Sequence, residues 1–164
     1  MKATIVIYGS STGTCESIAQ TIASKLGVKA VDVSHLTEAD VNDHDNLILG
    51  TSTWGAGDMQ DDWYDGVKVL AKTGLQGKMV AIFGCGDSEG YSDTFCGGMA
   101  ELAESARQAG ANLVGQVDVS GYTFDDSASV SDGKFVGLPL DDVNEPDKTE
   151  NRIDAWIAEI EPLL

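Results

Sequence analysis

Small and hydroxylated residues are concentrated in one short stretch near the start of the chain. Residues 9–15 read Gly-Ser-Ser-Thr-Gly-Thr-Cys, directly after an apolar run and directly before a helical pattern. Backbone N–H groups at the start of a helix, supplemented by hydroxyl groups, can hold a phosphate. The stretch contains no lysine or arginine, so it favours a ligand with one terminal phosphate. The same residues are also compatible with a plain strand-to-helix turn capped by serine or threonine.

The common nucleotide-binding motifs are missing from this stretch. A Walker A loop requires GxxxxGK[ST], and residues 9–15 supply neither the spacing nor the lysine. The GxGxxG dinucleotide fingerprint does not follow this strand either. We therefore expect neither a nucleoside triphosphate nor a nicotinamide dinucleotide bound in the Rossmann manner.

Two further glycine-rich loops each carry an aromatic side chain. Residues 51–58 include Trp54, and residues 84–96 include Tyr91. An exposed aromatic side chain at the end of a strand favours a flat ligand that covers it. A phosphate site together with two aromatic walls predicts a phosphorylated planar ring as the ligand.

Short apolar runs alternate with helical patterns along the chain, and these elements must position the three loops. The pattern predicts strands over residues 4–8, 30–33, 47–49, 79–83 and 113–119, and helices over residues 18–26, 63–72, 95–109 and 153–160. Such alternation is typical of the α/β class, with a parallel sheet covered by helices on both faces in three layers. Ligands of these sheets bind beyond the carboxyl ends of the strands, where the three loops lie.

One segment interrupts the alternation. Residues Ser120 to Pro139 form a stretch that is too long for an ordinary connection, so we interpret it as an insertion. Residues 134–140 again have strand character, which predicts that the last strand is split around this insertion. The aromatic residues of the segment are compatible with packing or with recognition of a partner; they are Tyr122, Phe124 and Phe135.

The composition limits the classes of partner. The 164 residues fit a single domain over residues 1–164, and 27 acidic against 10 basic residues give a net charge of -17. A field of that sign disfavours nucleic acid and anionic membranes. Protein partners should present basic surfaces. We expect a monomer.

The cysteine and hydropathy patterns predict a cytoplasmic protein. The first apolar stretch is too short for a signal peptide, and no run approaches the roughly 20 apolar residues that span a bilayer. Cys15, Cys85 and Cys96 are odd in number and form no CxxC pair, so we expect reduced thiols. Neither histidine has a second ligand at a suitable spacing, and we expect no metal site.

Taken together, these features resemble the flavodoxin family, specifically its long-chain type. Residues 10–15 are similar to the family's phosphate loop, Ser52-Thr53-Trp54-Gly55 to its first flavin loop, and residues 84–95 to its second. The resemblance spans the whole chain and includes the insertion. The sheet order 2-1-3-4-5 with FMN at the switch point is known for flavodoxin itself, so the resemblance implies it. It therefore implies a doubly wound, five-stranded parallel sheet with an insertion in the last strand, and FMN as the cofactor.

The resemblance also implies a set of FMN-binding residues. In chain order these are Ser10, Ser11, Thr12, Gly13, Thr14, Cys15, Ser52, Thr53, Trp54, Gly55, Gly86, Asp87, Tyr91, Thr94, Phe95 and Cys96. Residues 10–15 would surround the phosphate, and the hydroxyls of Ser52 and Thr53 would contact the phosphate and the ribityl chain. Trp54 and Tyr91 would sandwich the ring, and backbone groups near Asp87, Thr94 and Cys96 would meet its pyrimidine edge.

Two positions depart from the family pattern. Cys15 stands where the family usually has threonine, and it could contribute its backbone N–H alone. Val143 stands where some long-chain relatives have an aspartate that binds the ribityl chain. Asp141 or Asp142 could replace that carboxylate.

The implied function is a low-potential, one-electron carrier that uses bound FMN and shuttles electrons between redox enzymes through the semiquinone/hydroquinone couple. Such a carrier is not an enzyme and has no substrate of its own. Acidic residues crowd the two flavin loops, and their charge disfavours a reduced, anionic flavin. The alternative is an FMN-dependent NAD(P)H:quinone-type reductase, which would require a flavin face open to its substrate.

Gly55 can rotate its peptide freely, and we expect Gly55→Ala to lower the oxidised/semiquinone potential.

Overall fold

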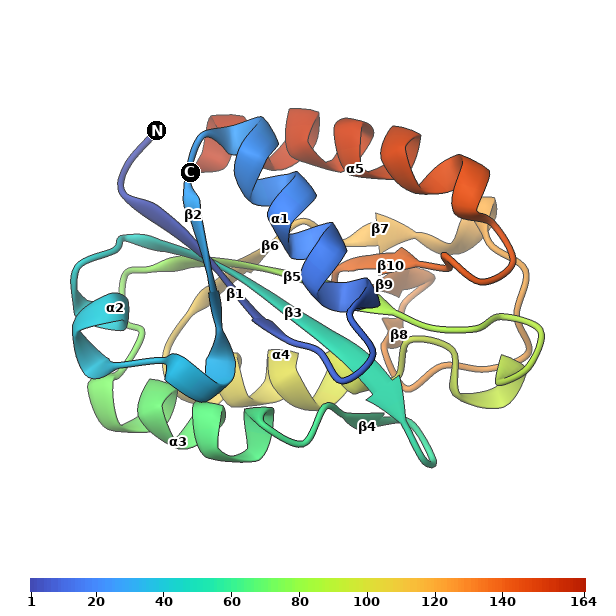
Figure 1. Cartoon of the computed structure of the whole chain (residues 1–164), viewed down its shortest axis with the longest axis horizontal. Coiled ribbons are helices and arrows are strands. Elements are labelled where there is room, and N and C mark those ends of the chain that lie inside the picture. Colours follow the sequence, from blue (N-terminus) through green and yellow to red (C-terminus); the bar gives the residue numbers. More distant parts are fainter.

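Five parallel strands form the main path of the seven-stranded central sheet in this computed structural model, which describes residues 1–164 (Figure 1). The strands are β1 (Thr4–Gly9), β2 (Lys29–Asp32), β3 (Asn46–Trp54), β5 (Met79–Cys85) and β10 (Leu138–Leu140). They lie in the order β10-β5-β3-β1-β2. With β5 and β10 as the fourth and fifth strands, this is the order 2-1-3-4-5 that the resemblance implied. The prediction of a doubly wound α/β fold is confirmed.

Helices cover both faces of this sheet, as predicted. The helices α1 (Thr14–Leu26) and α5 (Pro146–Ile160) lie on one face, and α3 (Trp63–Thr73) and α4 (Gly98–Gln108) lie on the other (Figure 1). Successive strand residues point to opposite faces, so Ile5 and Ile7 pack under α3 and α4 while Val6 and Tyr8 pack under α1 and α5. Burial on both faces explains why the strands read as unbroken apolar runs.

Glycine ends two of the helices close to the predicted boundaries at residues 26 and 72. α1 is followed by Gly27 with φ 69° and α3 by Gly74 with φ 75°. The start of α4 was predicted wrongly, because the helix begins at Gly98 and not at residue 95. Cys96 takes φ 50°, a left-handed conformation that is incompatible with a continuous helix. The short helix α2 (Glu38–Asn42) was not predicted, although a capping box between Thr37 and residue 40 begins it.

The last strand is split, as the sequence predicted, but the boundaries differ. β6 (Asn112–Val114) pairs with the first part of β5, and β10 pairs with its last three residues. The single predicted strand over residues 113–119 is divided in the structure. Gly115 with φ 83° turns the chain away after β6, and β7 (Val117–Asp118) belongs to a separate sheet. The insertion therefore occupies residues 115–137, and Leu138 and Pro139 belong to the main sheet.

The insertion forms a small antiparallel sheet of its own. Its strands are β7 (Val117–Asp118), β8 (Val130–Ser131) and β9 (Lys134–Phe135), in the order β7-β9-β8. The rings of Tyr122, Phe124 and Phe135 all pack around Phe95, with centroids 5.6 to 6.1 Å from it. The aromatic residues of the insertion therefore serve packing, the first of the two interpretations above.

No helix of the structure has both the length and the apolar character needed to cross a bilayer.

Candidate functional site

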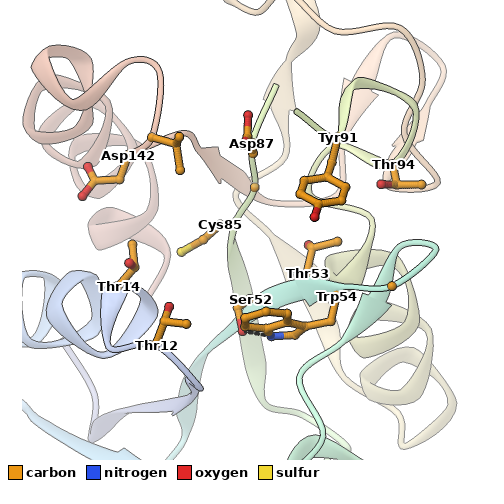
Figure 2. A pocket seen from close by; sticks show the side chains of 13 residues that line it. Thr12, Thr14, Ser52, Thr53, Trp54, Cys85, Asp87, Tyr91, Thr94 and Asp142 are labelled. Atoms are coloured by element: carbon orange, nitrogen blue, oxygen red, sulfur yellow. Dashed lines mark hydrogen bonds between the residues drawn. The ribbon is translucent and has the colours of Figure 1, made fainter. Parts of the chain in front are cut away.

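A cleft of about 310 Å³ lies at the carboxyl ends of the central strands (Figure 2). Its lining residues come from the ends of β3 and β5, the start of α1 and the segments that follow β1, β3, β5 and β10. They are Thr12, Thr14, Ser52, Thr53, Trp54, Gly55, Cys85, Gly86, Asp87, Tyr91, Thr94, Asp142 and Val143. Parallel strands bring these loops to the same edge of the sheet. The cleft lies at the edge where the sequence predicted a ligand-binding site.

The loop between β1 and α1 presents unused backbone donors. Gly13 has φ 94°, and its N–H donates to the Ser10 hydroxyl at 3.1 Å, which fixes the turn. The backbone N–H groups of Thr12, Thr14 and Cys15 have no acceptor within the protein. Because they stand at the start of the 13-residue helix α1, they form a site with partial positive charge and no cationic side chain.

Residues 51–58, which the sequence indicated as a glycine-rich loop, form the end of β3 and a hairpin. β3 runs on to Trp54 and pairs back with β4 (Asp58–Met59) through an antiparallel contact between Trp54 and Asp58. The indole Nε1–H of Trp54 donates to the Ser52 hydroxyl at 2.7 Å (Figure 2). This hydrogen bond and the hairpin hold the indole at the cleft while 41% of the residue remains exposed.

The second aromatic wall belongs to the loop between β5 and α4. Tyr91 is 64% exposed and lines the cleft together with Asp87 of the same loop. Figure 2 shows the rings of Tyr91 and Trp54 reaching the cleft from different loops. Both rings are open to a ligand. Trp54 and Tyr91, which the sequence predicted as aromatic walls, therefore line the same cleft.

A hydrogen-bond network shapes the loop that carries Tyr91. The Asp87 carboxylate accepts hydrogen bonds from the backbone N–H of Gly90 at 2.7 Å and from the Asn144 amide at 2.7 Å, which lowers the pKa of Asp87. Burial opposes ionisation of Asp141, but hydrogen bonds from Ser88 and Asn144 outweigh that effect and lower its pKa. Both carboxylates are therefore held in the ionised form.

Ten of the sixteen predicted residues line the cleft, and six do not. The six that do not are Ser10, Ser11, Gly13, Cys15, Phe95 and Cys96. The hydroxyls of Ser10 and Ser11 accept hydrogen bonds from Gly13 N–H and from the Gln60 amide, so they shape the loop. The ring of Phe95 is 1% exposed and belongs to the aromatic cluster of the insertion.

The side chains of Cys15 and Cys96 lie beneath the cleft. A Cβ added to Gly86 would lie 2.8 Å from the Cys96 nitrogen, which places Cys96 directly under the cleft floor. The Cys15 thiol lies against the Cys85 thiol, and this neighbour together with burial raises the pKa of Cys15. Burial likewise raises the pKa of Cys96. These two residues can offer backbone groups to a ligand but not their thiols.

Three residues of the cleft were outside the predicted set. Cys85 is the last residue of β5, and its position next to Gly86 was the signal that could have found it. Asp142 and Val143 follow β10, and Val143 is 67% exposed at the rim. Of the two aspartates considered at this turn, Asp142 lines the cleft, whereas Asp141 is fully buried away from it.

Fold and cleft together define a doubly wound α/β protein with a site for a phosphorylated aromatic ligand. The family model described as Flavodoxin matches residues 6–156. The chain belongs to the flavodoxin family. The family assignment made from the sequence motifs is thereby confirmed.

Individual relatives agree over almost the full length. The flavodoxin of Synechocystis sp. is 41% identical over 97% of this chain and 96% of its own length. Flavodoxin 1 of Azotobacter vinelandii is 40% identical over 93% of this chain and 92% of its own. A crystal structure of Fusobacterium nucleatum flavodoxin bound to flavin mononucleotide has a TM-score of 0.92 and 30% identity, covering 100% of this chain and 99% of that one.

Proposed function

We propose that this flavodoxin binds FMN in the cleft and acts as a low-potential, one-electron carrier between redox enzymes. The observation that carries the proposal is the pairing of unused N–H groups at the start of α1 with two exposed aromatic rings across one cleft. When bound, FMN supplies the one-electron chemistry, and the protein supplies binding, orientation and electrostatics.

The donor set of the cleft fits FMN from one end to the other. The N–H groups of Thr12, Thr14 and Cys15 and the nearby hydroxyls would hold the phosphate. Trp54 and Tyr91 would cover the two faces of the ring. Asp142, the carboxylate at the rim of the cleft, would take the place of the ribityl-binding aspartate of some long-chain relatives.

The charges of the cleft favour a low potential. Asp87 and Asp142 are among its lining residues, and no lysine or arginine is among them. Added electrons make the ligand more negative, and nearby carboxylates oppose that change. The net charge of -17 also supports redox partners with basic docking surfaces, which would be attracted over long range to a monomeric carrier.

The same geometry argues against the reductase alternative. A quinone reductase would need one face of the flavin to be free for hydride transfer and for the quinone. In this cleft Trp54 and Tyr91 would each cover one face of the flavin, and both are exposed lining residues. The proposal is therefore a carrier without a substrate of its own.

A reconstitution experiment tests the proposed function. Apoprotein is loaded with FMN and reduced stepwise with dithionite under potentiometric control. We expect stoichiometric binding, two separate one-electron steps and a second potential below that of free FMN. Failure to bind FMN would contradict the proposal. Steady NAD(P)H oxidation with a quinone and no added reductase would favour the quinone-type reductase instead.

A substitution at Gly55 tests how the hairpin tunes the flavin. Gly55 has φ 55°, and an added Cβ would lie 3.1 Å from the Asp58 carboxylate. Alanine in this conformation costs about 1 kcal/mol and restricts rotation of the peptide at the cleft. We expect Gly55→Ala to lower the first one-electron potential of the FMN-loaded protein in a potentiometric titration.

Gly133→Ala is the matched control for that substitution. Gly133 has φ 76° and open space around it, and it lies in the insertion, away from the cleft-lining residues. It should carry a similar backbone strain and leave the potential unchanged. Equal first potentials in Gly55→Ala and wild-type protein would contradict the prediction.

A further inference from the structure

One buried carboxylate joins the cleft loop after β5 to the turn before α5. Asp141 directly follows β10 and is 0% exposed. It accepts hydrogen bonds from the backbone N–H of Ser88 at 3.2 Å and from the Ser88 hydroxyl. Its other oxygen accepts from the backbone N–H of Asn144 at 2.9 Å. Asp141 therefore connects two segments that lie more than fifty residues apart in the chain.

The side chain of Asn144 extends this connection to the cleft. Its amide donates to the Asp87 carboxylate at 2.7 Å and to the Asp141 carboxylate at 3.0 Å. It thus provides a neutral donor between two carboxylates that repel each other. The Asp87 carbonyl in turn accepts from the N–H of Tyr91 at 2.9 Å. A continuous set of hydrogen bonds therefore runs from Asp141 through Asn144 and Asp87 to the backbone of Tyr91.

The burial of Asp141 has an energetic consequence. An ionised carboxylate out of contact with water is tolerated only where hydrogen bonds replace its hydration. Those hydrogen bonds come from Ser88 and Asn144, so any other arrangement of the loop would leave the charge unsatisfied. Neither Asp141 nor Asn144 lines the cleft. Their effect on a ligand must therefore be indirect.

We propose that Asp141 and Asn144 are positioning residues, which act through Ser88 and Asp87 to hold the loop that carries Tyr91 in its flavin-binding shape. This inference rests on the proposed FMN function. The loop they hold would contact the ring, whereas the phosphate would lie at the start of α1. The pair therefore governs affinity for the ring and leaves the phosphate's contribution unchanged.

The test compares FMN with riboflavin, which has the same ring and no phosphate. Dissociation constants are measured by quenching of flavin fluorescence for wild type, Asp141→Asn and Asn144→Asp. Loss of charge-assisted hydrogen bonds should weaken binding of both ligands about tenfold. The ratio of the two dissociation constants should stay at the wild-type value. Asp147→Asn, an exposed carboxylate in the first turn of α5, is the control and should bind like wild type.

Two further measurements separate positioning from general destabilisation. The effects of Ser88→Ala and Asp141→Asn on affinity should be less than additive in the double variant, because both act through the same contact. At saturating FMN, the first reduction potential of Asp141→Asn should differ from that of wild type, because a displaced loop changes the charge and hydration around the ring. A purely structural role would leave that potential unchanged.

The outcomes distinguish this inference from the function on which it rests. If wild-type protein fails to bind FMN, the proposed function fails. If wild type binds and Asp141→Asn binds both ligands with wild-type affinity, the positioning role is wrong and the function stands. A loss confined to FMN would also overturn the inference, because it would place the effect at the phosphate. If Asp141→Asn does not fold, Ser88→Ala and Asn144→Asp carry the same test.

Discussion

Riboflavin should bind the apoprotein at least about 1,000-fold more weakly than FMN, which corresponds to about 4 kcal/mol. The difference reports the phosphate, which would accept hydrogen bonds from the unused N–H groups of Thr12, Thr14 and Cys15. Hydrogen bonds to a charged group are worth about 1.5–3 kcal/mol each, and the start of α1 adds a favourable field. Fluorescence quenching titrations of the two flavins against the same apoprotein measure the ratio.

No lysine or arginine lines the cleft, so hydroxyl groups should contribute to the preference for FMN over riboflavin. Thr12→Val keeps the shape of the side chain and removes a hydroxyl that lines the cleft. It should reduce the preference for FMN over riboflavin while riboflavin affinity stays constant. Equal affinities of FMN and riboflavin for wild-type protein would show that residues 9–15 are only a strand-to-helix turn, the simpler interpretation of the sequence.

Tyr91→Ala should raise the dissociation constant of FMN by about 10- to 100-fold. Stacking of a planar ring on an aromatic side chain is worth about 1–3 kcal/mol. Tyr91 is 64% exposed, so its removal should change the free energy of unfolding of the apoprotein by less than about 0.5 kcal/mol. Fluorescence titration gives the affinity, and urea unfolding of the apoprotein checks the stability.

Tyr64 offers a matched control for that substitution. It is also a tyrosine with large exposure, 41%, but it lies on α3 and does not line the cleft. Tyr64→Ala should leave FMN affinity at the wild-type value. If the two variants bind FMN equally well, Tyr91 does not cover the ring, and the cleft has one aromatic wall only.

The expected effects rank the parts of the cleft. The phosphate loop should contribute most to affinity, the Tyr91 ring less, and the network around Asp141 least. This order follows from how directly each part would contact the ligand. Charge-assisted hydrogen bonds to the phosphate are individually stronger than a stacking contact, and the network around Asp141 acts only through the loop that it holds. The glycine hairpin at Gly55 should influence the potential more than the affinity.

Much of the fold was determined by local signals in the sequence. Buried strands of a parallel sheet are apolar on both faces, so the run from Thr4 to Tyr8 identified β1 directly. Gly27 and Gly74 marked the ends of α1 and α3 because few other residues adopt a positive φ. The positions of Trp54 and Tyr91 at strand ends followed from the same local pattern, since parallel strands bring their carboxyl ends to one edge.

Tertiary structure alone decided where individual side chains point in the irregular segments. Phe95 lies in a predicted binding loop, yet its ring packs against the insertion, because Cys96 takes a left-handed conformation that turns the chain there. The distinction between Asp141, which is buried, and Asp142, which lines the cleft, depends on a hydrogen bond to Ser88. That contact spans 53 positions of the chain. Local composition carries no information on such a pairing, so the sequence determined the elements and the edge where they meet, and long-range packing determined which side chains reach the cleft.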